Sequence, residues 1–179
     1  MKRLFMLVLI TLLAACSGGT APSAPPSDAV SAFMAYFVAG EYDAAQALIS
    51  SSFSLDEIED EFRDIFKNLT YDITSENISG DRAYIALSIK TVDFAAIMED
   101  VMDDAFYLVF TDITVEELSS RVESMFVEKA TAYDAPIADR EVTVVLELND
   151  NGWMIVADDT FIDALMGGVI SFAEYARGW

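Results

Sequence analysis

The sequence predicts an α+β domain in which an antiparallel sheet of two hairpins packs against helices. Two observations predict this fold. Apolar and polar residues alternate in two separate pairs of short segments, which is typical of hairpins, and apolar residues at helical spacing precede, separate and follow these pairs. Two hairpins that each carry an apolar face can bury both faces by sharing one sheet covered by helices.

The N-terminal part of the domain carries three segments with helical spacing. Ser27-Asp28 can cap the first helix, which Gly40 ends, and residues 41–49 form a short second helix. The pattern Ser54-x-x-Glu57 is a capping box for a third helix that runs to Leu69. We expect the first two helices to face the core with Val30, Phe33, Met34, Phe37, Val38, Tyr42, Ala45, Leu48 and Ile49.

The middle of the chain predicts a hairpin followed by two helices. Residues 71–78 and 83–89 alternate on either side of the turn Ser79-Gly80-Asp81. Asp93 can cap the next helix, and the capping box Thr114-x-x-Glu117 opens another. We expect eight apolar residues of the first of these helices to face inward: Phe94, Ile97, Met98, Val101, Met102, Phe106, Val109 and Phe110.

The C-terminal part predicts a second hairpin and a last helix. Residues 140–148 and 153–156 alternate around the turn at 149–152. Asp158-Asp159 begins the helix, and Gly167-Gly168 weakens its middle by about 1 kcal/mol per glycine. Its inward residues would be Phe161, Ile162, Leu165, Met166, Val169, Ile170 and Phe172.

The composition excludes several classes of function. The 179 residues include no histidine, so no imidazole base, imidazole metal ligand or Ser-His-Asp triad is present. The single cysteine permits neither an internal disulfide nor a CxxC site. A formal net charge of −21 argues against a nucleic-acid partner, because phosphate binding needs clusters of Lys and Arg.

Residues 1–15 have the pattern of a signal peptide. A basic start, Met1-Lys2-Arg3, precedes an apolar stretch over residues 4–13, and the small residues Ala14 and Ala15 follow. The apolar stretch is too short for a membrane span, which needs about 20 residues. These features predict export from the cytoplasm.

The residues around Cys16 refine this prediction. Leu13-Ala14-Ala15-Cys16 resembles the bacterial lipobox, and this resemblance implies cleavage between Ala15 and Cys16 and acylation of the Cys16 thiol, for example with palmitate. A thiolate is a suitable nucleophile for that modification, and two or more acyl chains anchor a protein stably. The alternative is an ordinary secretion signal with an incidental cysteine.

The segment after Cys16 predicts a tether rather than folded structure. Residues 16–28 are rich in Ser, Gly and Pro, and residues 29–179 are long enough for a single globular domain. Loss of residues 1–15 would remove two basic residues and no acid, which leaves a net charge of −23. Because such a surface repels anionic lipids, we expect the domain to stand away from the bilayer on the extracytoplasmic side.

Taken together, the lipobox, the first helix, Gly40-Glu41-Tyr42-Asp43-Ala44-Ala45 and the closing hairpin with Asn151-Gly152-Trp153 resemble a group of small lipoproteins of unknown function from Gram-positive bacteria. The domain of that group is similar to the nuclear-transport-factor-two-like, or cystatin-like, fold. The resemblance implies a curved, cone-like sheet closed by helices, often around an apolar cavity. This chain differs by its helical insertion at residues 93–130 and by its C-terminal helix.

Clustered carboxylates suggest a cation site as one alternative function. Glu99 with Asp103, or Asp100 with Asp104, lie four residues apart on a predicted helix and could offer oxygen ligands to calcium. A solvated helix face explains the same pattern. Other acids occur as Asp56-Glu57-Glu59-Asp60-Glu61 and Asp158-Asp159, and the spacing Glu147, Asn149, Asn151, Gly152, Asp158 only loosely resembles a calcium loop and fits a hairpin turn.

An enzyme is a second alternative. Some enzymes of the resembled fold, such as ketosteroid isomerase, use a carboxylate base and a hydrogen-bond donor inside the cone. Tyr36, Tyr84 and Tyr107 are possible donors, but core or rim packing is the more common role of such tyrosines. Four methionines lie among aromatics at helical spacing, which indicates core packing rather than a copper site: Met98, Met102, Met125 and Met166.

These observations favour a membrane-tethered, non-catalytic lipoprotein of the cell envelope whose domain binds a small ligand or an envelope protein. The sequence predicts no cofactor and no catalytic residue. A buried carboxylate facing a tyrosine in a closed pocket would favour the enzyme. An exposed apolar patch without a pocket would favour binding of a partner protein.

Overall fold

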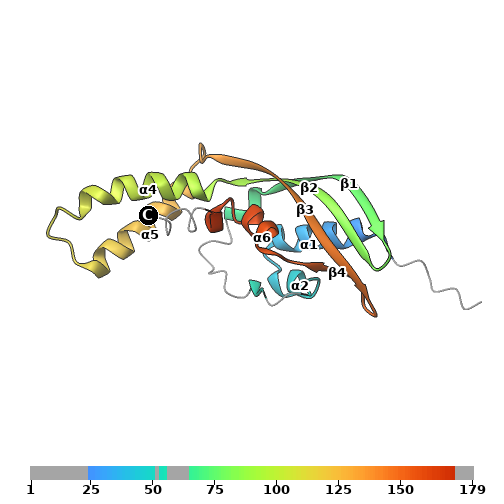
Figure 1. Ribbon diagram of the computed structural model, residues 1–179. Helices are drawn as coiled ribbons and strands as arrows, with labels where there is room; N and C mark the ends of the chain where they lie inside the picture. Colours follow the sequence, from blue (N-terminus) through green and yellow to red (C-terminus); the bar gives the residue numbers. More distant parts are fainter. Residues whose placement is uncertain (1–23, 51–52, 56–64, 172–179) are drawn as a thin grey trace, which may run out of the picture.

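A computed structural model of the chain describes residues 24–50, 53–55 and 65–171, and it confirms the predicted α+β class (Figure 1). The sheet and the helices each form from the segments with the matching hydrophobic period. The described elements are α1 (Pro26–Ala39), α2 (Tyr42–Gln46), the 3₁₀ helix η2 (Ile65–Asn68), β1 (Thr70–Ser79), β2 (Arg82–Val92), α4 (Phe94–Leu108), α5 (Val115–Ala130), β3 (Ile137–Asn149), β4 (Gly152–Val156) and α6 (Asp159–Leu165).

The two predicted hairpins share one antiparallel sheet in the order β1-β2-β3-β4. Although α4 and α5 lie between β2 and β3 in sequence, Val92 at the end of β2 pairs with Ile137 at the start of β3. The next residues stay together, because Asp93 N donates to Pro136 O at 2.8 Å. The helical pair therefore leaves the sheet and returns to it at one point, and projects from that end (Figure 1).

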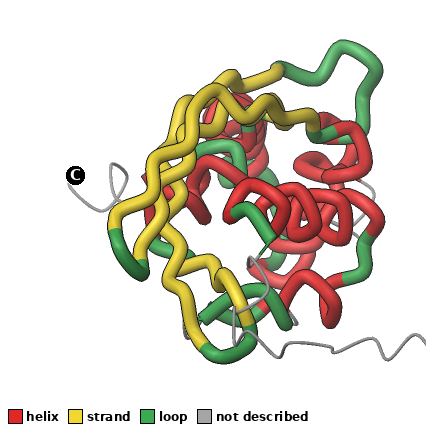
Figure 2. The backbone as a smooth tube through the Cα atoms, turned by 90° about the vertical axis from the view of Figure 1, so that its right-hand side faces the viewer, coloured by secondary structure: helices red, strands yellow, loops and turns green. Residues whose placement is uncertain are grey.

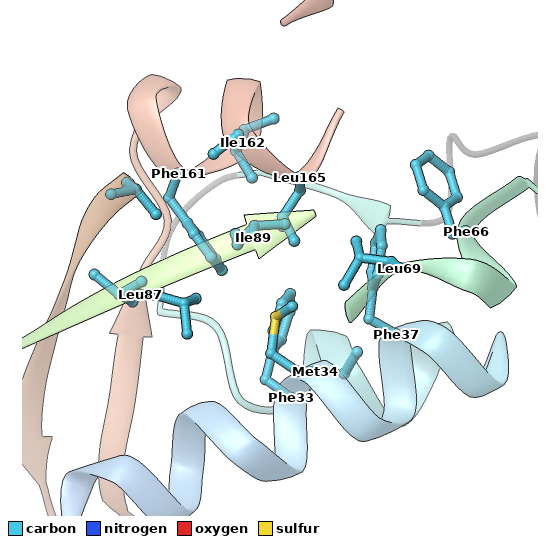
Figure 3. Packing of buried hydrophobic residues seen from close by; sticks show 14 of the residues in the cluster. Phe33, Met34, Phe37, Phe66, Leu69, Leu87, Ile89, Phe161, Ile162 and Leu165 are labelled. Carbon is cyan, nitrogen blue, oxygen red and sulfur yellow. The ribbon is translucent and has the colours of Figure 1, made fainter. Parts of the chain in front are cut away.

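The sheet bends around the helices that cover one of its faces (Figure 2). Figure 3 shows α1 and α6 facing each other across the core beside β2, with aromatic side chains between them. The ring of Phe33 lies 5.6 Å from that of Phe161, and the ring of Phe37 lies 5.1 Å from that of Phe66. All four side chains are at most 1% exposed, so aromatic rings fill this interior.

The first two helices differ in their ends from the prediction. The helix α1 begins at Pro26, before the predicted cap, because a proline in the first turn already has a helical φ and lacks an N–H that would be unsatisfied there. The helix α2 ends at Gln46. The chain beyond it joins the sheet edge, since Ile155 N donates to Leu48 O and Ser50 N donates to Ile155 O, both at 2.8 Å.

The predicted third helix falls largely outside the described residues. Its capping box needs Glu57, which is not described, and of its expected length only Leu55 and η2 are described. Leu55, Ile65 and Phe66 are buried, which agrees with their predicted apolar character.

The last helix is shorter than predicted, and its two glycines are the reason. Gly167 and Gly168 have φ values of +57° and +91°, so they end the helix instead of weakening its middle. The buried carboxylate of Asp163 then accepts hydrogen bonds from Ile170 N at 2.8 Å and Ser171 N at 3.0 Å. The chain beyond the glycines is thereby held against α6.

The largest correction concerns the apolar face of α4. The structure buries Phe94, Ile97 and Val101, but the expected inward residues further along are more than half exposed: Met102, Phe106, Val109 and Phe110. The helix runs beyond the end of the sheet, where α5 is the element that packs against it (Figure 1). One helix covers one stripe of α4 and leaves the adjacent stripe in solvent.

Candidate functional site

The candidate functional site is the apolar surface at the end of the α4–α5 pair, which we call the tip patch. Its residues are between 53% and 75% exposed: Met102, Phe106, Tyr107, Val109, Phe110 and Val115. Soluble proteins rarely expose a contiguous apolar surface unless it meets a partner or a ligand. The tip patch is therefore an exposed apolar surface of the kind expected for binding of a partner protein.

The spacing of residues along α4 accounts for the exposed row within the patch. Phe94, Ile97 and Val101 recur at three and four residues and form the buried stripe. Met102 and Phe106, with Phe110 in the turn that follows α4, recur at four residues and form a second stripe beside it. The two stripes together are wider than the single face that α5 covers.

Aromatic contacts order the outer stripe. The ring of Phe106 lies 5.3 Å from that of Phe110 and 6.0 Å from that of Tyr107, both in edge-to-face geometry. Edge-to-face contacts restrict the orientation of aromatic side chains, which have few rotatable bonds. A partner that packs on the patch therefore meets a surface that is already partly ordered.

The base of the α4–α5 pair is fixed to the domain. The carboxylate of Asp93 caps α4 by accepting from Ala96 N at 3.1 Å. The ring of Phe94 lies 5.7 Å from that of Phe66 and 5.4 Å from that of Phe126 on α5. These contacts join both helices to the core, so the direction in which the tip patch projects is set by the fold.

The turn between the helices is stabilised by the predicted capping box. Thr114 donates to Glu117 Oε2 from its N–H at 3.0 Å and from its hydroxyl at 3.1 Å, and Glu117 N donates to Thr114 Oγ1 at 3.2 Å. The N–H and hydroxyl of Thr114 hold the pKa of Glu117 below its usual value. The start of α5 is therefore closed by reciprocal hydrogen bonds between these two residues.

The acids of α4 divide into two groups. Asp100 and Asp104 both form ion pairs with Lys129 of α5, the latter at 2.9 Å. The hydrogen bond to Asp100, and to a smaller extent the one to Asp104, raises the pKa of Lys129. Glu99 and Asp103 form no ion pair within the part of the chain that the structure describes. They remain as unpaired negative charges beside the outer stripe.

This division bears on the predicted cation site. The ammonium of Lys129 occupies the position between Asp100 and Asp104 where a metal ion would bind. Across residues 24–50, 53–55 and 65–171, no three carboxylate or thiol side chains gather closely enough to hold a metal ion. Lys129 therefore engages the Asp100–Asp104 pair, whereas the Glu99–Asp103 pair stays a prediction.

An open hollow lies between α4 and α5 on the side that carries Lys129. It has a volume of about 440 Å³ and is lined by Asp104, Leu108, Arg121, Met125, Glu128 and Lys129. Its lining is mixed in charge and open to solvent, and the exposed aromatic rings are not part of it. The tip patch therefore lies outside this hollow.

The other carboxylates noted in the sequence have structural roles where they are described. Asn149 Oδ1 accepts from Asn151 N at 2.8 Å, which confirms a hairpin turn at the loosely calcium-like spacing. Glu147 forms an ion pair with Arg82 across the sheet at 2.6 Å. Asp158 caps α6 by accepting from Phe161 N at 2.8 Å. The acids at 56–61 lie outside the described residues.

The tyrosines proposed as hydrogen-bond donors lie on the surface. Tyr36 and Tyr84 are each 38% exposed, and Tyr107 is 73% exposed. Asp163 is a buried carboxylate, but its bonds go to Ile170 N, to Ser171 N and to the Ser171 hydroxyl at 2.6 Å. Among the described residues, none of these tyrosines is therefore paired with a buried carboxylate.

The methionines follow the prediction of core packing except at one position. Met98, Met125 and Met166 pack against the hydrophobic core as partly buried residues, whereas Met102 is 53% exposed and belongs to the tip patch. The prediction failed for Met102 because helical spacing shows that a residue lies on an apolar face but not whether another element covers that face.

The residues predicted for lipidation and cleavage, Cys16 and Ala15, lie outside the described residues. In the described part of the chain, no helix combines the length and the apolar character needed to cross a membrane.

Comparisons with known proteins identify no family. No family model matches the chain. No curated protein matches it. A solved structure from Bacillus subtilis, described as that of a "putative lipoprotein (ycdA)", aligns at 22% sequence identity with a TM-score of 0.46, over 79% of this chain and 44% of the other. The chain thus spans less than half the length of that protein. At this level of similarity the alignment assigns neither a family nor an activity.

Proposed function

We propose that this protein is a bacterial lipoprotein of the cell envelope, anchored through Cys16 on the extracytoplasmic side, whose non-catalytic domain binds a partner protein through the tip patch. The observation that carries the proposal is a row of exposed aromatic side chains at the end of a projecting helix pair. Aromatic residues and methionine are enriched where proteins meet partners, because they supply large contact areas.

The anchor is supported by the sequence around the cysteine. The signal peptide pattern, the lipobox-like Leu13-Ala14-Ala15-Cys16 and the Ser-, Gly- and Pro-rich residues that follow are the features expected of a tethered lipoprotein. Cys16 is the only cysteine in the sequence, which makes an incidental cysteine at this position a weaker explanation.

The direction of the tip patch also supports the proposal. The start of α1 lies near the β1–β2 turn, where Ser27 N donates to Glu76 Oε2 at 3.1 Å. The α4–α5 pair leaves from the opposite end of β2, so the tether would join the domain at one end and the tip patch lies at the other (Figure 1). A membrane anchor at that position would present the patch away from the lipid.

The interior gives no support to the enzyme alternative. The space between α1, α6 and the sheet is occupied by Phe33, Phe37, Phe161 and neighbouring side chains (Figure 3). Acid–base catalysis needs a polar group that can reach a bound substrate. The described candidates for such a group are engaged in caps or ion pairs or lie on the surface.

We expect the substitution Cys16→Ser to release the protein from membranes and to abolish incorporation of radiolabelled palmitate. The reason is that a serine hydroxyl is not the thiol nucleophile that accepts the lipid. Cell fractionation and labelling of the full-length protein measure both effects. The matched control is Ser17→Ala, which alters the neighbouring position and should leave both unchanged. A Cys16→Ser protein that stayed in the membrane fraction would contradict the anchor.

The docking surface can be tested in cells with a photoreactive residue. We expect p-benzoylphenylalanine at position 110, in place of Phe110, to give a discrete protein adduct of higher mass after irradiation. The same residue in place of Tyr84, on the sheet and far from the helix pair, is the control and should give none. Equal adducts at both positions, or none at position 110, would count against the tip patch as the binding surface. Mass spectrometry of the adduct identifies the partner.

A further inference from the structure

We propose that the partner presents an amphipathic helix with an apolar face bordered by Lys and Arg, and that this helix packs along α4 over the tip patch. The inference rests on the proposed function and specifies the chemistry of the partner. It is carried by three features of α4: the spacing of the exposed apolar side chains, the position of the unpaired acids beside them, and the net charge of the helix pair.

The spacing fits a helix as the docking element. Met102 and Phe106 stand four residues apart on α4 and belong to one of the ridges along which helices pack against each other, and Phe110, in the turn after α4, continues the same spacing. The helix α4 has 15 residues, a length of about 22 Å, which offers several turns of contact. An amphipathic helix places its own apolar residues at the same intervals and so meets such a row continuously.

The acids beside the row determine the charge of the partner. Glu99 lies three residues before Met102, and Asp103 lies three residues before Phe106, so both carboxylates border the outer stripe. Neither forms an ion pair within the described residues, whereas Asp100 and Asp104 on the other side of α4 are held by Lys129. Basic side chains at the edge of a docked helix would pair with Glu99 and Asp103.

The whole helix pair reinforces this preference. Residues 94–130 contain nine Asp and Glu and only two basic residues, Arg121 and Lys129. Such a surplus of negative charge accelerates encounter with basic partners and disfavours acidic ones. An apolar surface of this charge therefore selects a partner that is both apolar and basic.

The same charges disfavour two other occupants. Docking of a second copy would bring Glu99 and Asp103 of two mature chains, each with a formal net charge of −23, toward each other. Docking on an anionic membrane would meet the same repulsion, and the patch lies at the end of the domain opposite to the start of α1 (Figure 1). Both remain measurable outcomes of the experiment below.

The test uses the mature, lipidated protein reconstituted in phosphatidylcholine vesicles and three fluorescent helical peptides as long as α4. The first peptide has Leu and Phe on one face and Lys along both borders, the second has Glu in place of each Lys, and the third is a scrambled sequence of the first. Fluorescence anisotropy measures binding, with protein-free vesicles as the blank. We expect the basic peptide to bind and the other two to bind at least tenfold more weakly.

Two variants separate the apolar and the charged parts of the surface. Phe106→Ser with Phe110→Ser should weaken binding of the basic peptide about thirtyfold or more, as expected for the loss of a central aromatic anchor. Glu99→Gln with Asp103→Asn should weaken it about two- to fivefold and reduce its salt dependence, since these acids pair at the rim. Tyr84→Ser and Glu141→Gln, both on the sheet, are the matched controls and should bind as the unchanged protein does. Circular dichroism confirms that each variant is folded.

Several results would overturn the inference. Equal binding of the acidic and basic peptides would refute the charge preference, and full binding by the Phe106→Ser, Phe110→Ser variant would refute the location. Concentration-dependent dimers that this variant abolishes would show a second copy as the occupant. Binding to anionic vesicles that is lost in the same variant would show a lipid surface. An adduct at position 110 in cells without binding of the basic peptide would leave the proposed function standing and reject only the basic helix.

Discussion

Phe37→Ala should lower the free energy of unfolding by about 3–5 kcal/mol, whereas Phe110→Ala should change it by less than about 0.5 kcal/mol. The side chain of Phe37 is 1% exposed, and its ring lies 5.9 Å from that of Phe33 and 5.1 Å from that of Phe66. Truncation therefore removes a large buried surface and leaves a cavity among aromatic rings. Phe110 is 75% exposed, so its truncation removes little that is buried.

Urea denaturation of the mature protein, followed by tryptophan fluorescence and circular dichroism, measures both changes. The pair is informative because the sequence pattern assigns both phenylalanines to inward helix faces. If Phe110→Ala destabilised the protein as much as Phe37→Ala, the outer stripe of α4 would be covered in solution and the tip patch would not be an open surface. If Phe110→Ala changed stability little but abolished binding of the basic peptide, the side chain of Phe110 would serve binding rather than folding.

Gly167→Ala should cost about 3 kcal/mol or more. The backbone at Gly167 has a φ of +57°, which costs an L-residue about 1–2 kcal/mol. A Cβ atom there would also lie 2.0 Å from the carbonyl oxygen of Val92, so the chain at the junction of β2 and α4 would have to move. Displacement of packed backbone adds about 1–3 kcal/mol.

Gly80→Ala is the matched control for this substitution. Gly80 has a similar φ of +64°, but nothing lies within 4 Å of a Cβ atom added to it. It should therefore show the conformational cost of about 1–2 kcal/mol and no more. Equal midpoints of urea unfolding for the two variants would show that the close approach of Gly167 to Val92 adds nothing to the destabilisation caused by Gly167→Ala.

The position of Gly167 also links the C-terminal part of the domain to the tip patch. Ala95 N, in the first turn of α4, donates to Gly167 O at 3.4 Å, and Arg140 Nη2 donates to the same oxygen at 3.4 Å. A shift at Gly167 thus reaches the base of α4 directly. The chain after α6 forms part of the support that sets the direction of the helix pair.

Much of the fold followed from the sequence because its signals are local. The turn at Gly80 and Asp81, the cap at Asp93, the capping box at Thr114 and the cap at Asp158 each satisfy backbone groups within a few residues. The alternation in β2 and β3 likewise shows which side chains share a face, whatever that face later meets. These features predicted the element order and the single antiparallel sheet.

Other features depended on contacts between segments that are distant in sequence. The double glycine ends α6 because Gly167 approaches Val92, which is 75 residues earlier in the chain and invisible to a local pattern. The edge contact of Ile49 with Ile155 shortens α2 for the same kind of reason. In each case a distant partner determined the backbone conformation that the local residues permitted.

The sequence by itself determined the acidic surface, the absence of imidazole chemistry, the α+β class, and which residues of α4 are apolar. Only the tertiary structure decided which of those apolar residues are buried. Phe94, Ile97 and Val101 face the core and α5. Met102 and Phe106 on α4, and Phe110 in the turn after it, lie past the end of the sheet, where no described element covers them. Hydrophobic periodicity reports the face of a helix on which a residue lies, but burial requires a second surface, and the position of that surface is a property of the whole fold.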